Sequence, residues 1–248
     1  MDFDEYRPAY SEETGLNVPQ SALIMVFMTV FMDSLSSTIS MPVLPYYALS
    51  FGVSTWAVGY LYASFNLAGF FGTPLLGRLS DTYGRRTVLI LSLVGSGLAA
   101  LCQAASPCFA ALLAFRALSG IWGAVMPTAQ VYLGDVCSYA VLTDHMAKLS
   151  QVPAFSRTMG PALGGGLSNF GLEIPILVDG LVSLVTAALV FVYVPESPAW
   201  RASKVAVAEG SVEDSDEGVA AGSGGEGNGL AKGKGKGKGK GKGKGKGK

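Results

Sequence analysis

Long apolar stretches alternate with short polar or proline-containing segments along the chain up to about Trp200. A helix needs about 20 mostly apolar residues to cross a lipid bilayer, and six of the stretches reach that length. We therefore expect six transmembrane helices. They cover residues 20–46, 55–77, 87–106, 109–132, 147–170 and 174–194.

Charged residues are almost absent from the first apolar stretches. Between Thr14 and Gly77 the only charged residue is Asp33. Over the whole sequence 50% of the residues are hydrophobic and 15% are charged, with a mean hydropathy of +0.40. A soluble domain of this size carries charges over its whole surface, so the composition predicts an all-α integral membrane protein. The composition does not indicate which membrane.

Three segments of the chain differ in composition. Residues 1–19 are acidic, residues 20–200 hold the apolar stretches, and residues 201–248 are polar and end in a Lys-Gly repeat. We interpret them as an N-terminal segment, a transmembrane domain and a disordered tail, because the tail has too few apolar residues to pack. A polybasic tail of this kind binds anionic membrane lipids. A low-complexity extension without a binding role remains an equal alternative.

The basic residues indicate the orientation of the helices. The turns near 47–54, 106–108 and 170–174 contain no Lys or Arg, whereas the alternate connections contain several. Basic residues favour the cytosolic side of a membrane, so we expect a multi-pass protein with both termini in the cytosol.

One charged segment follows the second apolar stretch and has a regular spacing, G-x-x-x-D-x-x-G-R-R. Its fixed positions are Gly77, Asp81, Gly84, Arg85 and Arg86. The pattern resembles the cytosolic loop between the second and third helices of major facilitator superfamily transporters. It departs from the family at Thr82, where a basic residue is usual. The alternative interpretation is a loop whose arginines only fix the membrane orientation.

Two further segments are similar to motifs of the same superfamily. Arg116, Gly120 and Gly123 match the R-x-x-x-G-x-x-G pattern of its fourth helix. The fifth stretch matches the G-P-x-x-G-G signature of its antiporter branches, and we call these residues the antiporter motif: Gly160, Pro161, Gly164 and Gly165. Close packing of membrane helices is the alternative explanation for these glycines. The segment 194–198 also resembles the sequence that follows helix six in sugar porters.

The resemblance is strongest to proton-coupled drug antiporters, and it covers about residues 20–200. It implies a six-helix bundle of two three-helix repeats, equivalent to the N-terminal half of the superfamily fold. It also implies secondary active transport of a small organic solute, by proton antiport and alternating access between two six-helix halves. The sequence contains one half. A truncated fragment, a homodimer and a separately encoded second half are the three explanations that remain open.

Asp33 is the first candidate for proton coupling. It lies about 20 Å along the first predicted helix, near the middle of the bilayer, and shares a face with Ser36, Ser37 and Ser40. An ionisable group at that depth is costly, which makes it a functional candidate. A buried structural pair is the alternative.

Arg116 is the expected counter-charge of Asp33, directly or through water, because the resemblance places helices one and four at the central cavity. Gln130 continues the face of the helix that carries Arg116. Snorkelling of Arg116 to the membrane surface is the alternative. Arg157 and Asp179 form a second candidate pair in the same cavity.

The sequence contains no nucleotide-binding loop, catalytic triad or metal-ligand spacing. We therefore expect no enzymatic activity, no cofactor, no metal and no nucleic-acid partner. The expected partners are a small solute, protons, membrane lipids, and a second copy or second half. The competing function is a membrane protein that binds a partner without transporting a solute.

Overall fold

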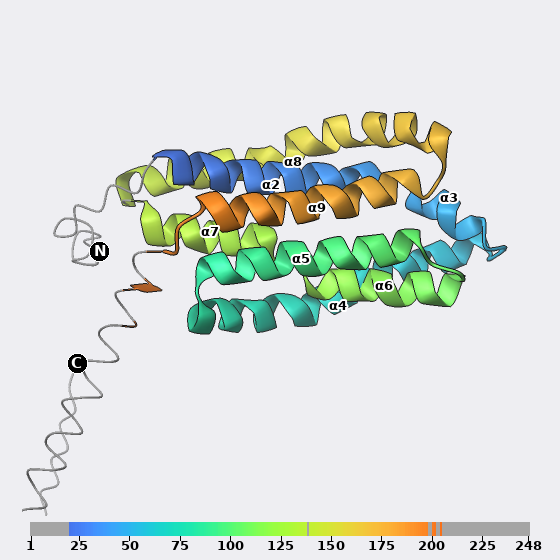
Figure 1. The fold of residues 1–248 in the computed structure, drawn as a ribbon, viewed down its shortest axis with the longest axis horizontal. Helices are drawn as coiled ribbons and strands as arrows, with labels where there is room; N and C mark the ends of the chain where they lie inside the picture. Colours follow the sequence, from blue (N-terminus) through green and yellow to red (C-terminus); the bar gives the residue numbers. More distant parts are fainter. Residues whose placement is uncertain (1–19, 138, 198–199, 202–203, 205–248) are drawn as a thin grey trace, which may run out of the picture. The chain divides into compact units, whose positions relative to one another are not determined.

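The computed structural model describes residues 20–137, 139–197, 200–201 and 204, and the regular structure in these ranges is entirely helical (Figure 1). The predicted N-terminal segment 1–19 and nearly all of the predicted tail 201–248 lie outside the described residues. The helices are α2 (Gln20–Ser40), α3 (Leu44–Leu49), α4 (Thr55–Tyr83), α5 (Arg85–Ala104), α6 (Phe109–Ile121), α7 (Val125–Val136), α8 (Tyr139–Leu167), the 3-10 turn η2 (Ser168–Phe170) and α9 (Ile174–Tyr193).

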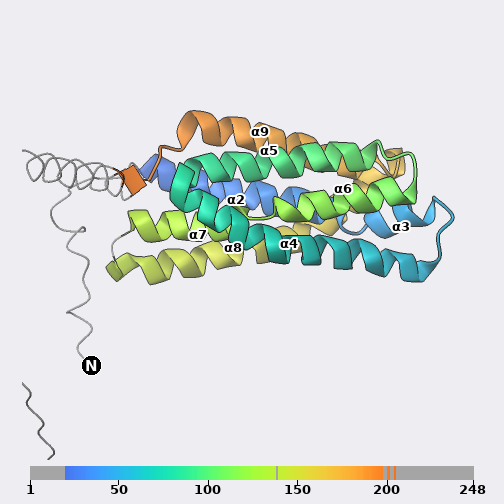
Figure 2. The same cartoon turned by 90° about the horizontal axis from the view of Figure 1, so that it is seen from below.

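The long helices lie side by side and pack in a pattern that repeats (Figures 1 and 2). Helix α2 packs against α8 and α9, while α6 packs against α4 and α5. Helices α5 and α9 pack along each other. The crossing helices fall into two sets of three: α2, α4 and α5, and then α6 with α7, α8 and α9. The first helix of each set contacts the second and third helices of the other set. This is the arrangement that two three-helix repeats produce.

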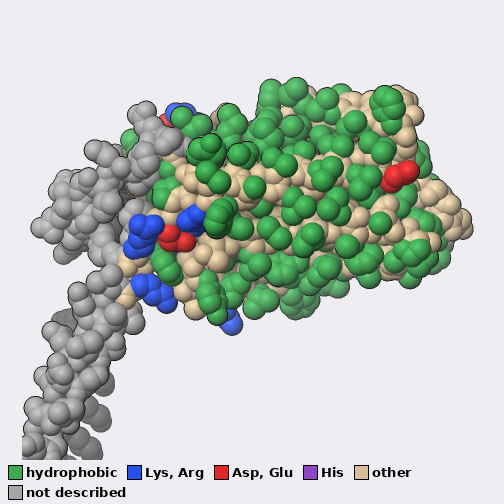
Figure 3. All heavy atoms as spheres, in the orientation of Figure 1, with side chains coloured by type: hydrophobic (Ala, Val, Ile, Leu, Met, Phe, Trp, Pro, Cys, Tyr) green, Lys and Arg blue, Asp and Glu red, His purple; other side chains and the backbone are tan. Residues whose placement is uncertain are grey.

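Four segments are long and apolar enough to cross a membrane by length and composition. They are Ala22–Ser40, Arg85–Ala104, Phe109–Val136 and Ile174–Tyr193. Helices α4 and α8 have 29 residues each, more than the length of a crossing, but they contain more polar residues. Large apolar side chains cover much of the visible face, and the Lys and Arg side chains on that face gather near one end (Figure 3). A lipid-facing surface has this character.

The segment 77–86 is not the loop that the sequence predicts. Helix α4 continues to Tyr83 and α5 begins at Arg85, so Gly84 alone connects them. Gly84 has a φ of 102°, which residues other than glycine rarely adopt. A Cβ atom at Gly84 would also lie 2.5 Å from the Glu196 carboxylate. The turn is tight because glycine supplies both the backbone angle and the space.

The first predicted helix is too long at its C-terminal end. Helix α2 ends at Ser40, a turn follows, and residues 44–49 form the separate helix α3. Pro42 lacks the N–H that would continue the α2 hydrogen bonds, and Pro45 lies in the first turn of α3, where proline is tolerated.

The fourth predicted helix, 109–132, is broken into α6 and α7 at residues 122–124. The Gly123 N–H donates to the Gly120 carbonyl at 3.2 Å. This bond spans three residues, whereas α-helical bonds span four, so the α-helix ends here. Pro127 removes a further N–H from the following turn. The Trp122 ring lies so close to α5 that a Cβ atom at Gly95 would meet it at 2.4 Å.

The fifth helix begins earlier than predicted. Helix α8 starts at Tyr139, so the residues 139–146 that we expected in a cytosolic loop are helical. This extension is amphipathic, since Leu142 and Met146 pack against the main core while Asp144 and Lys148 pair on the exposed side. The sequence signal for a membrane crossing does not detect a helix that continues into water.

The main core lies between α2, α5, α7, α8 and α9. Its fully buried side chains include Val26, Leu93, Tyr132 and Leu149. A second cluster around Leu44, Leu61 and Leu112 fills the opposite end of the bundle. The two clusters hold the helices that carry the buried charged residues.

The antiporter motif lies on α8 where this helix touches α2. A Cβ atom at Gly160 would meet Thr38 at 2.6 Å, and one at Gly164 would meet the Ile39 carbonyl oxygen at 2.2 Å. Gly165 faces open space, and Pro161 is exposed. Two of the three glycines therefore permit the close approach of α8 to α2.

We expect Gly164→Ala to destabilise the bundle, because backbone atoms of α2 cannot move away as a flexible side chain can. Overpacking of this kind costs ~1–3 kcal/mol. Thermal unfolding of the purified protein in detergent measures the effect. Gly165→Ala is the matched control and should leave the midpoint unchanged. Equal midpoints for both variants would contradict the close α2–α8 contact.

Candidate functional site

Asp179 is a buried carboxyl group at the contact between α9 and α2. Its side chain is 9% exposed, and the Ser40 hydroxyl donates a hydrogen bond to Asp179 Oδ2 at 2.9 Å. The neighbouring Gly180 lies against Gly97 of α5, where an added Cβ would come within 3.0 Å of the Gly180 carbonyl. Close α5–α9 packing therefore fixes the position of Asp179.

Asp33 lies on α2 and interacts electrostatically with Asp179. It is half-buried, and Ser36 and Ser40, on the next two turns, are buried. The Ser36 hydroxyl donates to the Asp33 backbone carbonyl at 3.0 Å. Two carboxyl groups thus share one polar strip between α2 and α9.

Arg116 on α6 completes this group, which we call the membrane charge cluster: Asp33, Asp179 and Arg116. The guanidinium lies over the Phe65 ring, 4.4 Å from its centre, and interacts electrostatically with Asp179 and Tyr62. Its Nε atom is buried without a hydrogen-bond partner. Arginine over an aromatic face at this distance gains a cation–π attraction.

No ion pair within 4 Å joins Arg116 to Asp33 or to Asp179 among the side chains that the structure describes. The expected approach of Arg116 to Asp33, directly or through water, stays a prediction.

The remaining predicted cavity residues lie outside this cluster. Arg157 is exposed on α8, and no ion pair joins it to Asp179 within the described ranges. Gln130 is half-buried on α7. The sequence gives Arg157 and Asp179 as a second candidate pair, but it does not specify which helix face each side chain occupies.

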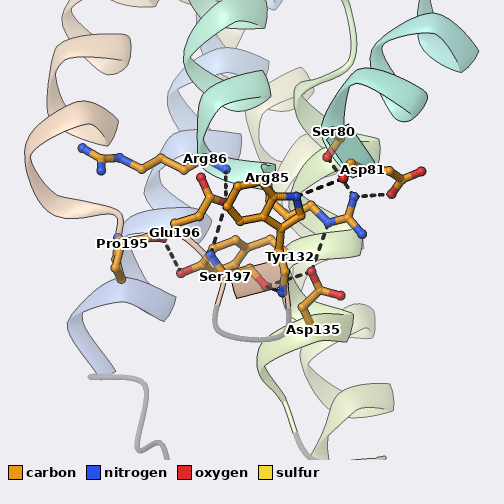
Figure 4. Close-up of polar contacts among 10 residues, drawn as sticks. Ser80, Asp81, Arg85, Arg86, Tyr132, Asp135, Pro195, Glu196 and Ser197 are labelled. Carbon is orange, nitrogen blue, oxygen red and sulfur yellow. Dashed lines mark hydrogen bonds and ion pairs between the residues drawn. The ribbon is translucent and has the colours of Figure 1, made fainter. Parts of the chain in front are cut away.

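The second polar group joins the ends of α4, α5 and α7 (Figure 4). Arg85 forms ion pairs with Asp81, one helical turn before it, and with Asp135, whose Oδ2 lies 3.0 Å from Arg85 Nε. Arg85 also donates to the Ser80 hydroxyl at 3.2 Å. One guanidinium therefore connects three helices. Gly77 lies one turn before Asp81 and has nothing near it, so it is not a close-packing glycine.

The segment after α9 closes over this group (Figure 4). The Glu196 carboxylate accepts hydrogen bonds from the Arg86 and Ser197 backbone N–H groups, at 3.1 and 3.2 Å. The Ser197 hydroxyl donates to Asp135 Oδ2 at 2.9 Å. Tyr132 donates to the Pro195 carbonyl at 3.2 Å. A carboxylate at the start of α5 also complements the positive end of the helix dipole.

We call this second group the connection cluster: Asp81, Arg85, Arg86, Asp135, Glu196 and Ser197. The sequence identifies its arginines and Asp81, and it notes Glu196 and Ser197 only within the segment 194–198 that resembles sugar porters. It assigns no contact to Glu196 and no role to Asp135. Asp135 and Glu196 lie 50 and 110 residues from their partners along the chain. The sequence shows that Asp135 and Glu196 are acidic residues at the ends of apolar stretches. It contains no pattern that connects them with partners so distant in the chain.

A small cavity of about 150 Å³ lies beside the connection cluster, between α4 and α7. Asp81, Arg85 and Thr128 are among its lining residues. No group of three or more His, Cys, Asp or Glu side chains that could hold a metal ion occurs in the part of the chain that the structure describes.

Comparison with known proteins gives consistent matches. The family model described as Major Facilitator Superfamily matches residues 26–237. The tetracycline resistance protein, class C, of Escherichia coli is 32% identical over 66% of this chain and 42% of its own length. Multidrug resistance protein 2 of Bacillus subtilis (strain 168) is 25% identical over 70% of this chain and 44% of its own.

A solved structure agrees with these matches. The crystal structure of the human organic anion transporter MFSD10 (TETRAN) aligns with a TM-score of 0.62 and 26% sequence identity. The alignment covers 73% of this chain and 49% of that one. The chain thus spans about half the length of the relatives it matches.

We expect Asp135→Asn to destabilise the described bundle by about 1–2 kcal/mol, because Arg85 loses a charged partner. The Arg85 and Asp135 side chains are only 14% and 20% exposed, so water does not replace the pair fully. Thermal unfolding in detergent measures the change.

The control is Asp144→Asn, which removes an ion pair with Lys148 whose side chains are 63% and 59% exposed. Exposed pairs of this kind contribute little, so no measurable change is expected. A loss in Asp144→Asn as large as that in Asp135→Asn would count against a structural role of the connection cluster.

Proposed function

This chain belongs to the major facilitator superfamily, and we propose that it acts in the secondary active transport of a small organic solute by proton antiport. The family is one of transporters, so the chain is an integral multi-pass membrane protein and not an enzyme. The observation that carries the proposal is the membrane charge cluster. Asp33, Asp179 and Arg116 lie within helices α2, α9 and α6, Asp179 is buried and bonded to Ser40, and Arg116 lies over the Phe65 ring.

Charged groups at this depth are costly, and a protein that only binds a partner in the membrane has little use for them. A carboxyl group that gains and loses a proton as the cavity changes sides couples proton movement to transport. Asp33 is the proposed proton carrier. Asp179 on α9 is the proposed neighbour that affects the charge state of Asp33, and Arg116 is the proposed neighbour of Asp179.

The relatives support a small organic solute as the substrate class. The names of these relatives describe tetracycline resistance, multidrug resistance and transport of organic anions. The names cover more than one kind of solute. The proposal for this chain is accordingly limited to the class.

A complete alternating-access cavity needs two six-helix halves in this family. We propose that a second half covers the face that carries the membrane charge cluster. A homodimer, a separately encoded half and a continuation of the same chain each satisfy this requirement. The antiporter motif and the connection cluster are the proposed sites where the halves and helices shift during the cycle.

Reconstituted vesicles with an imposed pH gradient test the function. The purified protein should move protons when tetracycline, an organic cation dye or an organic anion is supplied outside, as measured by a pH-sensitive dye inside. Asp33→Asn should reduce this exchange to the level of protein-free vesicles, because Asn cannot carry a proton.

Asp144→Asn is the control, since its exposed carboxyl lies away from the cluster. A folded wild-type protein with no flux for any probe would favour the competing function, a membrane protein that binds a partner without transport. Full coupling in Asp33→Asn would exclude Asp33 as the carrier.

We also propose that the turn at 105–108 faces away from the cytosol, since it lies at the opposite end of α5 from Arg85. The chain has three cysteines, and Cys108 is exposed in this turn. With the other two replaced by alanine, a membrane-impermeant maleimide should label Cys108 in intact cells. Cys137 retained alone should react only after permeabilisation, and slowly, because burial raises the pKa of its thiol. Labelling of Cys108 only after permeabilisation would reverse the topology.

A further inference from the structure

Arg85 and Arg86 are neighbours in the sequence, but their side chains take different directions (Figure 4). Arg85 extends into the connection cluster and pairs with Asp81 and Asp135. The Arg86 side chain extends away from these residues, while its backbone N–H donates to Glu196. The connection cluster therefore uses the backbone of Arg86 and leaves its guanidinium for another role.

The Arg86 side chain lies against the last turn of α9. Its Nη2 group donates a hydrogen bond to the Phe191 carbonyl, and its guanidinium carbon lies 5.1 Å from the centre of the Phe191 ring. An arginine over an aromatic face gains a cation–π attraction, so Phe191 holds the guanidinium in place. The Phe191 side chain is 63% exposed, which puts this pair at the surface of the bundle.

The charge of Arg86 is not neutralised within the described part of the chain, where no carboxylate lies within 4 Å of it. The Phe191 carbonyl accepts one hydrogen bond, and the Arg86 Nε atom is buried without a partner. A guanidinium has five N–H donors in a planar fork, so most of its donors have no acceptor among the described residues. Its outer N–H groups can bind an anion from outside the bundle.

The surface beside this arginine is suited to lipid. The exposed side chains of α9 are apolar or aromatic, and they include Leu181, Val185 and Val192. Helix α5 is apolar enough to cross a membrane, and its 20 residues extend over ~30 Å, the thickness of the hydrocarbon core. Arg86 lies in the first turn of α5, so it lies at the edge of the hydrocarbon core, where the lipid phosphates begin.

The charges at this end of the bundle favour an acidic lipid. Arg78, Arg201 and Lys204 are also exposed, and none of them has a carboxylate within 4 Å among the side chains described. The acidic residues of the connection cluster already accept bonds from its own members. In Figure 3 the basic side chains of the visible face lie at the end of the apolar surface. Basic residues beside a membrane attract acidic lipids.

The N-terminus of α5 is not the anion site, because the Arg86 backbone N–H already donates to Glu196. The guanidinium itself matches a phosphate, which it can bind through two parallel N–H groups. A phospholipid can place its phosphate on Arg86 and its acyl chains on the apolar face of α9, whereas a free phosphate has no use for that face. We propose that the Arg86 guanidinium, supported by Phe191, binds the phosphate of an acidic phospholipid.

This lipid site goes beyond transport and does not depend on it, because neither Arg86 nor Phe191 belongs to the membrane charge cluster. The bound lipid touches the start of α5 and the end of α9 at once. Its headgroup therefore stabilises the contact of these two helices from the lipid side, next to the bond between Arg86 and Glu196.

Lipid titration of the detergent-purified full chain, followed by native mass spectrometry, tests the proposal. The probes are dioleoyl phosphatidylglycerol, which is acidic, and dioleoyl phosphatidylcholine, which has the same phosphate and acyl chains but no net charge. The wild-type protein should bind phosphatidylglycerol more tightly. Arg86→Gln should lower the affinity for the first phosphatidylglycerol by about fivefold, since a basic residue near a membrane surface contributes on that scale.

Phe191→Leu keeps the arginine but removes the aromatic ring, so it should weaken phosphatidylglycerol binding by a smaller factor. Arg78→Gln is the matched control, because it removes an exposed arginine from the same end and should retain most of the affinity. All variants keep the Lys-Gly tail, so lipid binding by the tail is the same in each. Thermal unfolding without added lipid checks that each variant is folded.

Equal affinities of Arg86→Gln and the wild type would overturn the proposal, as would an equal loss in Arg78→Gln. Equal binding of the two lipids by the wild type would also overturn it. Inorganic phosphate in large excess should leave the lipid bound, and complete displacement would assign the site to a free anion instead. If Arg86→Gln does not fold, Phe191→Leu decides the question, because an unchanged phosphatidylglycerol affinity in that variant contradicts the site.

Discussion

The membrane interior contains no water to solvate a charge, and the rest of this structure follows from that constraint. Charged groups inside the bundle must find partners on neighbouring helices or be neutralised by protons. Asp179 bonds Ser40 of α2, and Arg116 lies over the Phe65 ring of α4. The glycines of α5, α8 and α9 permit the close helix contacts around Asp179 and α2. The glycines that permit close helix packing therefore also determine where the buried charged residues lie.

The same constraint explains which features could be predicted from the sequence. A crossing needs a long apolar stretch, so the helices of the bundle were visible in the pattern of apolar residues. Asp33 and Arg116 could be identified because they are charged residues within long apolar stretches, where charged residues are rare. Depth along a helix follows from counting residues, and both were placed inside the membrane in this way.

The features that could not be predicted depend on local backbone geometry or on contacts distant in sequence. The break at residues 122–124 comes from a tight turn at Gly120 and Gly123, inside a stretch that the hydrophobic pattern gives as one continuous crossing. The reduction of the 77–86 loop to Gly84 depends on the missing Cβ of glycine, because the Glu196 carboxylate occupies the space where a Cβ would lie. Asp179 was recognised as a cavity residue, but its contact with Ser40 joins residues 139 positions apart. Hydrophobic periodicity contains no information of this kind.

The connection cluster has a consequence for the order in which the protein is made. Asp81 and Arg85 are four residues apart, so both members of this ion pair are synthesised at almost the same time. Asp135 follows Arg85 by 50 residues, and Glu196 follows Arg86 by 110. At a synthesis rate of ~5–20 residues per second, Glu196 emerges several seconds after the arginines. Until then the start of α5 has no carboxylate partner from Glu196. Glu196 follows α9, so the helices α2 to α9 that the structure describes are all synthesised before it. Its bond to Arg86 joins the segment after α9 to the start of α5.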